Sequence, residues 1–180
     1  MLDKVYFGGT YAYKNFINDD ERLELEEWIL SKKELMTFSR PINSEEDQYA
    51  PGLKRHFKVL HTDEEKPEIF HRIRNKLLDL ENITNPLPAP GNLDWIGIVG
   101  EGSYVEPHCD ANFPDYYTVR YNLLVSFPDA GGRPIYGDEI LPVEEKMLWR
   151  CDAGIVKHSS EIVKGDKLRI NLSYGFSFEF

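Results

Sequence analysis

The stretch KLRINLSYGFSF, residues 167–178, alternates apolar and polar side chains along its whole length. Because successive side chains of a β-strand point to opposite faces of a sheet, it predicts a strand with one apolar and one polar face. The polar face either meets water, as in many half-covered sheets, or lines an internal pocket. In a pocket, Arg169 would offer a forked pair of N–H donors to a carboxylate, and Asn171 on the same face could orient that carboxylate.

The chain from residue 94 onward is expected to be mainly β. Short apolar or alternating stretches lie between glycines and prolines there, without a helical period. Several strands at this spacing predict a sandwich or a barrel. The predicted strands are Trp95–Val99, Tyr117–Phe127, Glu145–Trp149, Gly154–His158 and Lys167–Phe178.

Residues 1–93 have a mixed pattern, with a short strand predicted at Leu2–Phe7. A helix is predicted at Asn18–Ser31, where Asn18 and Glu21 have the spacing of a capping box. A second helix is predicted from Pro67 to Glu81, because proline suits a first helical turn and apolar residues follow at helical spacing.

The polar stretch 39–52 predicts a surface loop, either a solvated connection or a lid. We therefore expect one domain over residues 1–180, with residues 1–93 as a helical and strand support and residues 94–180 as a β core.

Composition restricts the class of protein. A chain of 180 residues with 41% hydrophobic and 13% aromatic residues is not intrinsically disordered. The net charge of −10 argues against nucleic acid as the main partner, because a negative field repels phosphate backbones. The sequence has no apolar run long enough for a membrane helix, no signal-peptide pattern, and two cysteines, too few for a disulfide framework. These features predict a cytoplasmic protein and leave its oligomeric state open.

The His-x-Asp tripeptide from His108 to Asp110 is the first candidate for a metal-binding motif. Side chains two apart on an extended chain point to one side, so this imidazole and carboxylate can converge on one metal ion. His158 is the histidine that follows in the predicted β region. Two histidines and one carboxylate on one face of an ion leave the other positions open, as in non-haem Fe(II) oxygenases. Each of the three residues is also compatible with an ordinary structural role. Cys109, between His108 and Asp110 in the sequence, is expected to be buried and to point away from the ion.

Together these motifs resemble the double-stranded β-helix core of the Fe(II)- and 2-oxoglutarate-dependent oxygenases, most closely the prolyl 4-hydroxylase-like branch. The resemblance extends from about residue 95 to residue 176. It implies an α+β, mainly β fold: a jelly-roll or cupin-like core with the N-terminal helices packed on one sheet. The segments that carry it are EGSYVEPHCD (101–110), the strand Tyr117–Phe127 with DAGG (129–132), LWRCDAG (148–154) leading to His158, and GDKLRIN (165–171).

The resemblance implies a role for each matching residue. His108, Asp110 and His158 would bind Fe(II), and Arg169 would pair with the distal carboxylate of 2-oxoglutarate. Dioxygen would be the third reactant, and 2-oxoglutarate would be converted to succinate and CO2 while a substrate C–H bond is hydroxylated. Asp110 favours hydroxylation, because the halogenases of the family lack this carboxylate.

The chain departs from the family where tyrosines commonly contact the cosubstrate. Ile98 and Leu124 stand at those places. Asn122, or else Arg120, on one face of the same predicted strand, is the candidate substitute.

Two other classes of function stay open at this point. One is a cupin-type isomerase or hydrolase that uses Zn or Mn, in which Arg169 binds substrate or nothing. The other is a non-catalytic β-barrel that binds a ligand or partner. For the oxygenase, analogy to prolyl hydroxylases suggests a peptidyl substrate, prolyl included, and a small molecule fits equally well.

Overall fold

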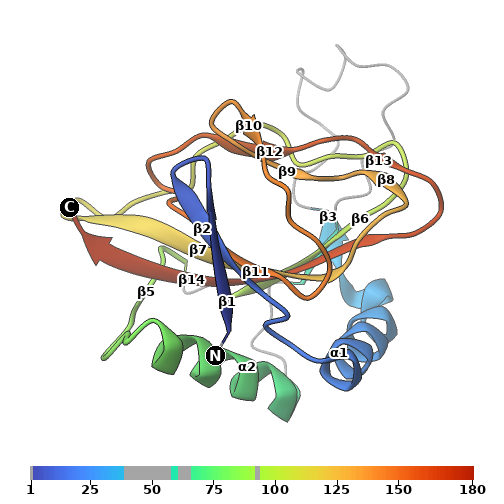
Figure 1. Ribbon diagram of the computed structural model, residues 1–180, viewed down its shortest axis with the longest axis horizontal. Coiled ribbons are helices and arrows are strands. Elements are labelled where there is room, and N and C mark those ends of the chain that lie inside the picture. Colours follow the sequence, from blue (N-terminus) through green and yellow to red (C-terminus); the bar gives the residue numbers. More distant parts are fainter. Residues whose placement is uncertain (1, 39–57, 61–65, 92–93) are drawn as a thin grey trace.

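The structure is a computed structural model that describes residues 2–38, 58–60, 66–91 and 94–180 (Figure 1). The predicted loop at 39–52 lies outside these residues. The described part contains the helices α1 (Asp19–Ser31) and α2 (Glu68–Leu80), a short 3-10 helix (Lys33–Leu35) and strands β1 to β14. None of the helices in these ranges is long and apolar enough to cross a membrane.

The larger sheet is antiparallel, and its strands follow the order β1-β2-β11-β7-β14-β6-β4-β3, with β5 paired to β14. Its centre is formed by the two longest strands, which pair along most of their length. The bounds are β1 (Asp3–Phe7), β2 (Thr10–Lys14), β3 (Thr37–Phe38), β4 (Lys58–Leu60), β5 (Leu87–Pro88), β6 (Trp95–Val99), β7 (Tyr116–Ser126), β11 (Leu148–Cys151) and β14 (Arg169–Glu179).

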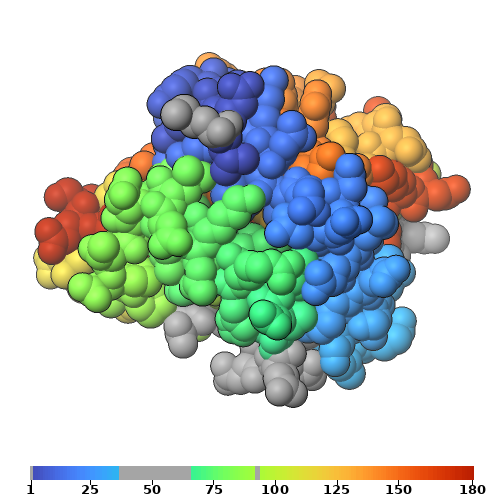
Figure 2. Space-filling model, turned by 60° about the horizontal axis from the view of Figure 1, so that its bottom comes forward, coloured from blue at the N-terminus to red at the C-terminus, as the bar shows by residue number. Residues whose placement is uncertain are grey.

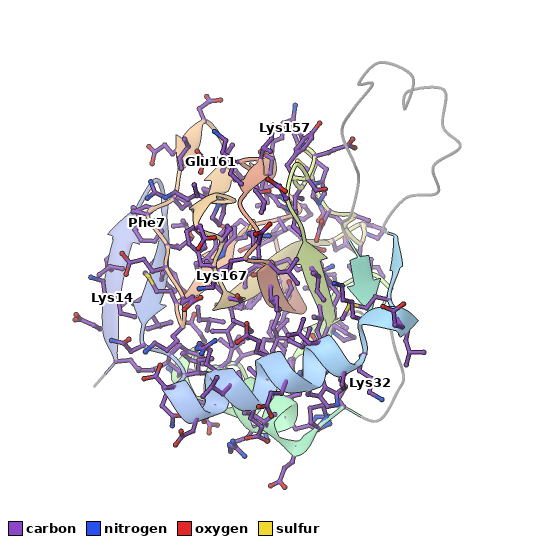
Figure 3. The ribbon with its side chains drawn as sticks, turned by 90° about the vertical axis from the view of Figure 1, so that its right-hand side faces the viewer. Phe7, Lys14, Lys32, Lys157, Glu161 and Lys167 are labelled. Carbon is purple, nitrogen blue, oxygen red and sulfur yellow. The ribbon has the colours of Figure 1, made fainter. Side chains whose placement is uncertain are left out.

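Smaller antiparallel sheets lie over one face of the larger sheet, as Figure 1 shows. One has the order β10-β9-β12 and the other pairs β13 with β8. Side chains lie between the two layers (Figure 3). The apolar ones form one buried cluster. The bounds are β8 (Ala130–Gly131), β9 (Pro134–Tyr136), β10 (Glu139–Ile140), β12 (His158–Ser160) and β13 (Val163–Lys164). This arrangement is the predicted double-stranded β-helix.

Both helices cover the opposite face of the larger sheet (Figures 1 and 2). Their apolar side chains form one buried cluster with the outward side chains of the central strands, so the N-terminal helices pack on one sheet, as predicted. The predicted capping box begins α1: the Asn18 side chain accepts from the Glu21 backbone, and the Glu21 side chain accepts from the Asn18 backbone. Pro67 stands at the N-cap of α2.

A polar cluster ties the end of α2 to the sheet. Glu81, the C-cap of α2, accepts hydrogen bonds from the hydroxyls of Tyr11, Tyr13 and Tyr121. Lys4 lies 3.8 Å from the same carboxylate. The helix end is thereby fixed to β2 and β7 by hydrogen bonds to a charged group, which are stronger than those between neutral groups.

Strand β14 decides between the two interpretations of its polar face. Every residue from Arg169 to Ser177 is buried, so neither face of this segment meets water. The apolar face packs under the helices, and the polar face points into the space between the sheets.

Two predicted strands have the wrong bounds in part, and several short strands were not predicted. Residues 153–155 form a turn, in which the backbone N–H groups of Ile155 and Val156 donate to the Asp152 carbonyl, and β12 begins only at His158. The strand predicted from Glu145 begins at Leu148, because a turn with Lys146 at φ 66° precedes it. The hairpin strand β2 was not predicted at all.

Candidate metal centre

Two segments far apart in sequence bring the candidate ligands together. His108 and His158 form an isolated β-bridge, in which each backbone N–H donates to the other residue's carbonyl, at 3.0 and 2.9 Å. The Asp110 N–H donates to the carbonyl of Ala153 at 2.8 Å. These backbone bonds place the His-x-Asp segment against the start of β12 and the turn before it.

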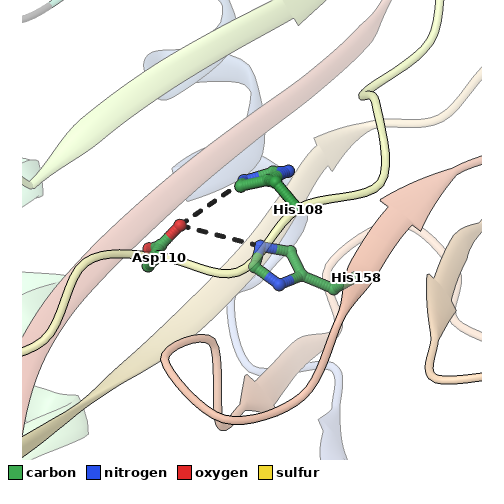
Figure 4. A group of neighbouring side chains, drawn as sticks. All are labelled: His108, Asp110 and His158. Atoms are coloured by element: carbon green, nitrogen blue, oxygen red, sulfur yellow. Dashed lines mark ion pairs between the residues drawn. The ribbon is translucent and has the colours of Figure 1, made fainter.

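The three side chains converge on one point (Figure 4). One ligand atom from each of His108, Asp110 and His158 lies within 4.8 Å of the other two. Oδ1 of Asp110 is 3.4 Å from Nε2 of His108 and 3.9 Å from Nε2 of His158. Two nitrogen donors and one carboxylate oxygen at this separation suit a divalent transition metal such as Fe(II).

Backbone carbonyls set the tautomers of both histidines. Nδ1 of His108 lies 2.7 Å from the carbonyl of Glu106, and Nδ1 of His158 lies 3.2 Å from that of Val156. A proton on each Nδ1 donates to these carbonyls, so Nε2 is the ring nitrogen of each histidine that faces Asp110. Metal-binding histidines are typically held by such a bond from the other ring nitrogen.

Charge at the centre favours the forms that bind metals. Burial alone would raise the pKa of Asp110, but the His108 ring and the Arg120 guanidinium outweigh it and hold this pKa well below its ordinary value. Burial, with repulsion from His108, lowers the pKa of His158 below 6.5. At neutral pH Asp110 is therefore ionised and His158 is neutral.

Arg169 is buried at the start of β14, on the inner face. Only 4% of the residue is exposed, and in the described part of the chain its Nε has no hydrogen-bond partner and no carboxylate forms an ion pair with it. Desolvation lowers the pKa of Arg169 to about 10. A buried, unpaired guanidinium is costly, and it is a ready site for a ligand carboxylate.

The two predicted asparagines also lie on this inner face. Nδ2 of Asn171 donates to Oδ1 of Asn122 at 3.1 Å, and Oδ1 of Asn171 has no partner among the described residues. The asparagines thus contact each other, and one acceptor is left for a ligand or solvent.

Sequence reasoning missed two further polar atoms on the inner face. Nε1 of Trp149 and Oγ of Ser173 are buried and have no hydrogen-bond partner within the described ranges. Both residues pair with Asn122 across neighbouring strands, so the three side chains form one row of the sheet. The alternation of β14 already placed Ser173 on the polar face. The position of Trp149 beside Asn122 could be known only from the register of β11 against β7.

The burial predicted for Cys109 was wrong, because this cysteine is exposed. Its neighbours His108 and Asp110 face the interior, so alternation turns Cys109 outward, where no layer covers it. Of the other histidines, His71 is exposed on α2. His56 and His61 lie outside the described residues.

No family model and no curated protein matches the chain. Solved structures match over nearly its whole length. A prolyl hydroxylase from Trichoplax adhaerens, in complex with a peptide fragment of the hypoxia inducible factor oxygen degradation domain, has a TM-score of 0.69 at 13% identity, covering 95% of this chain and 84% of that one. The viral collagen prolyl hydroxylase of Paramecium bursaria Chlorella virus-1, solved with 2-oxoglutarate, has a TM-score of 0.62 at 14% identity, covering 93% and 95%.

The chain shares their fold. A non-haem α-ketoglutarate-dependent epimerase from nogalamycin biosynthesis also matches, with a TM-score of 0.68 at 12% identity, covering 93% of this chain and 77% of that one. The resemblance predicted from the sequence is thereby confirmed at the level of the fold. The assignment of His108, Asp110 and His158 as iron ligands, and of Arg169, Asn122 and Asn171 as cosubstrate-binding residues, stays a prediction.

Proposed function

We propose that the protein is an Fe(II)- and 2-oxoglutarate-dependent dioxygenase. One observation carries the proposal: the protein combines a His-Asp-His group with a guanidinium that is buried on the inner face of β14 and has no counter-ion among the described residues. The first suits Fe(II), and the second suits a carboxylate that arrives with a ligand. The shared fold with 2-oxoglutarate-dependent enzymes supports the combination.

Each residue of the candidate site has an expected role. Nε2 of His108, Nε2 of His158 and Oδ1 of Asp110 would hold the iron and leave its remaining positions to the cosubstrate and dioxygen. When bound, the iron with these two reactants supplies the oxidation, which converts 2-oxoglutarate to succinate and CO2 and places one oxygen atom on a substrate C–H bond. Asp110 keeps the position that a halide would need, and we therefore favour hydroxylation.

Arg169 would pair with the distal carboxylate of 2-oxoglutarate. The inner face of the larger sheet continues from Arg169 through Asn171 to the row of Ser173, Asn122 and Trp149. The donors and the acceptor that have no partner among the described residues are available to the rest of the cosubstrate. This row would replace the tyrosine contacts that the chain lacks.

The substrate we propose is a peptidyl side chain, prolyl included, or a small molecule. The peptide bound by the Trichoplax hydroxylase supports the first class, and the epimerase shows that the fold also serves other reactions. A screen of peptides, free amino acids and small metabolites for the gain of one oxygen atom separates these classes.

The test of the cofactor assignment is anaerobic. Purified protein is loaded with Fe(II), and 2-oxoglutarate is added while the visible metal-to-ligand charge-transfer absorption of the chelate is followed. We expect the band in the unaltered protein, its loss in His158→Ala, and a much higher 2-oxoglutarate requirement in Arg169→Ala. Arg74→Met removes an arginine paired with Asp94 on the helical side and should behave like the unaltered protein. If folded, unaltered protein forms no band, the proposal fails, and the Zn or Mn cupin and the non-catalytic barrel take its place.

A further inference from the structure

Arg120 of β7 contacts the metal centre without belonging to it. Its Nε donates to Oδ2 of Asp110 at 2.7 Å, and its side chain is 10% exposed. Oδ2 is the oxygen that does not approach the histidines, since the 3.4 and 3.9 Å distances to His108 and His158 both involve Oδ1. The two carboxylate oxygens therefore have separate tasks: Oδ1 faces the candidate metal position and Oδ2 binds the arginine.

The sheet makes room for this arginine at one specific place. Gly175 of β14 pairs with Arg120 across the sheet, and a Cβ at Gly175 would lie 2.5 Å from Nη1 and 3.1 Å from Cζ. The backbone of Gly175 is outside the left-handed region, so the space, rather than the chain conformation, accounts for glycine here. The guanidinium also lies 6.0 Å from the ring of Trp95. The fold thus holds Arg120 in one orientation, aimed at Asp110.

We propose that Arg120 is a positioning residue that occupies Oδ2, so that Asp110 offers the metal one oxygen only. This inference rests on the proposed function. A carboxylate with both oxygens free can bind a cation through both, and here the second oxygen would take a coordination position that the cosubstrate or dioxygen needs. By holding Oδ2, Arg120 keeps that position open.

This role has a signature that a purely structural role lacks. Removing the guanidinium takes a positive charge away from a dication and frees a second ligand atom, and both effects favour metal binding. The same change closes a position to 2-oxoglutarate. If Arg120 only supported the local fold, its loss would let Asp110 move and would weaken metal binding instead.

The experiment compares Arg120→Met, Arg120→Lys and the control Arg74→Met with the unaltered protein. Co(II) binding is titrated by its visible absorption, and 2-oxoglutarate is titrated anaerobically into the Fe(II) protein. We expect Arg120→Met to bind Co(II) at least as tightly as the unaltered protein, with a changed spectrum, and to need on the order of tenfold more 2-oxoglutarate. Arg120→Lys, which keeps a donor and a charge, should recover part of the 2-oxoglutarate affinity. Arg74→Met should match the unaltered protein in both titrations.

Two results would overturn the inference: lost Co(II) affinity in Arg120→Met, or a 2-oxoglutarate titration unchanged from the unaltered protein. Thermal unfolding of the metal-free variants checks that they are folded. If Arg120→Met does not fold, Gly175→Ala, which must displace Nη1 while keeping the charge, is used in its place with the same expected loss of 2-oxoglutarate affinity. Failure of the proposed function is seen separately, because then the unaltered protein itself forms no complex with Fe(II) and 2-oxoglutarate, and the inference falls with it.

Discussion

Replacing Arg169 by methionine should stabilise the ligand-free protein. The guanidinium is buried, its Nε has no partner within the described residues, and desolvation is the single cause that lowers its pKa. Methionine has a similar length, fills the space with apolar atoms and needs no hydrogen bonds. The substitution therefore removes the cost of burying a charge and breaks no ion pair within the described residues.

The size of the effect follows from the pKa of Arg169. Its change from 12.5 to about 10 measures how much the folded state disfavours the charged form. At about 1.4 kcal/mol for each pH unit, the cost at neutral pH is about 3 kcal/mol. The sign follows from linkage: the depressed pKa destabilises the fold at every pH below about 10, and the cost declines as the native group loses its proton above that pH. Relaxation of the protein around a buried charge reduces this cost, so we take about 3 kcal/mol as the upper limit.

The assay is thermal unfolding at neutral pH, with and without 2-oxoglutarate and a redox-inert divalent metal. For a chain of this length about 3 kcal/mol corresponds to a rise of roughly 6–12 °C in Tm. The cosubstrate should reverse the order of stability, because a ligand at about 1,000 times its Kd stabilises the unaltered protein by about 4.1 kcal/mol and should hardly bind Arg169→Met. The control variant Arg74→Met, which removes the partly exposed ion pair of α2 with Asp94, should show no rise in Tm over the unaltered protein in either condition.

The reasoning is refuted if Arg169→Met unfolds at a lower temperature than the unaltered protein without ligand. That result would mean that the guanidinium has a stabilising partner in the free protein. An equal response of both proteins to 2-oxoglutarate would separately remove Arg169 from the cosubstrate site.

Three further outcomes are expected. Glu81→Gln should cost about 1–3 kcal/mol of unfolding free energy in denaturant titrations, because three tyrosine hydroxyls donate to this carboxylate. These hydrogen bonds outweigh the effect of burial and lower the pKa of Glu81. The stability that Glu81 contributes to the unaltered protein should therefore disappear as pH falls below about 4.5. Gly131→Ala should lower the free energy of unfolding by at least about 1 kcal/mol, since Gly131 has φ +67° and a Cβ there would overlap the carbonyl oxygen of Ile162. An unchanged free energy of unfolding in denaturant titrations would contradict the local backbone. A thiol reagent should modify Cys109 at once in the folded protein and Cys151 only after unfolding, because the first is exposed and the second is buried with a raised pKa; two rapid equivalents would contradict this placement.

Local patterns in the sequence predicted those elements that depend on neighbouring residues. The capping box of α1 is one example, because both of its hydrogen bonds join Asn18 to Glu21. The strand β6, Trp95–Val99, has the predicted bounds, because its apolar run is closed by Gly100. The hairpin of β1 and β2 had a signal in the sequence beyond the end of a strand: Gly8 and Gly9 both have positive φ, as a type I′ two-residue hairpin turn requires.

The candidate site was predictable in part for the same reason. The His-x-Asp spacing and the alternation of β14 are local, so His108, Asp110 and Arg169 could be selected from the sequence. The contacts that organise them are not local. Arg120 lies against Asp110, and Trp149 lies beside Asn122, because of strand register. Register depends on which strands meet, and alternation within one strand does not specify it.

The two faces of the central strands differ in how well their polar groups are satisfied. On the helical face, side chains such as Tyr174 and Phe176 pack in an apolar cluster, and the Tyr174 hydroxyl donates to the carbonyl of Phe70. On the inner face, the described residues leave four buried polar atoms unpartnered, on Trp149, Arg169, Asn171 and Ser173. At about 1–3 kcal/mol for each unsatisfied group, this is a large part of the 5–15 kcal/mol that stabilises a typical domain. Apolar residues at the same positions would give a more stable barrel, so stability does not account for this choice of side chains. A dicarboxylate that accepts from the two N–H donors and the hydroxyl would offset most of that cost, which is why the free protein should gain more from 2-oxoglutarate than from a monocarboxylate of the same length.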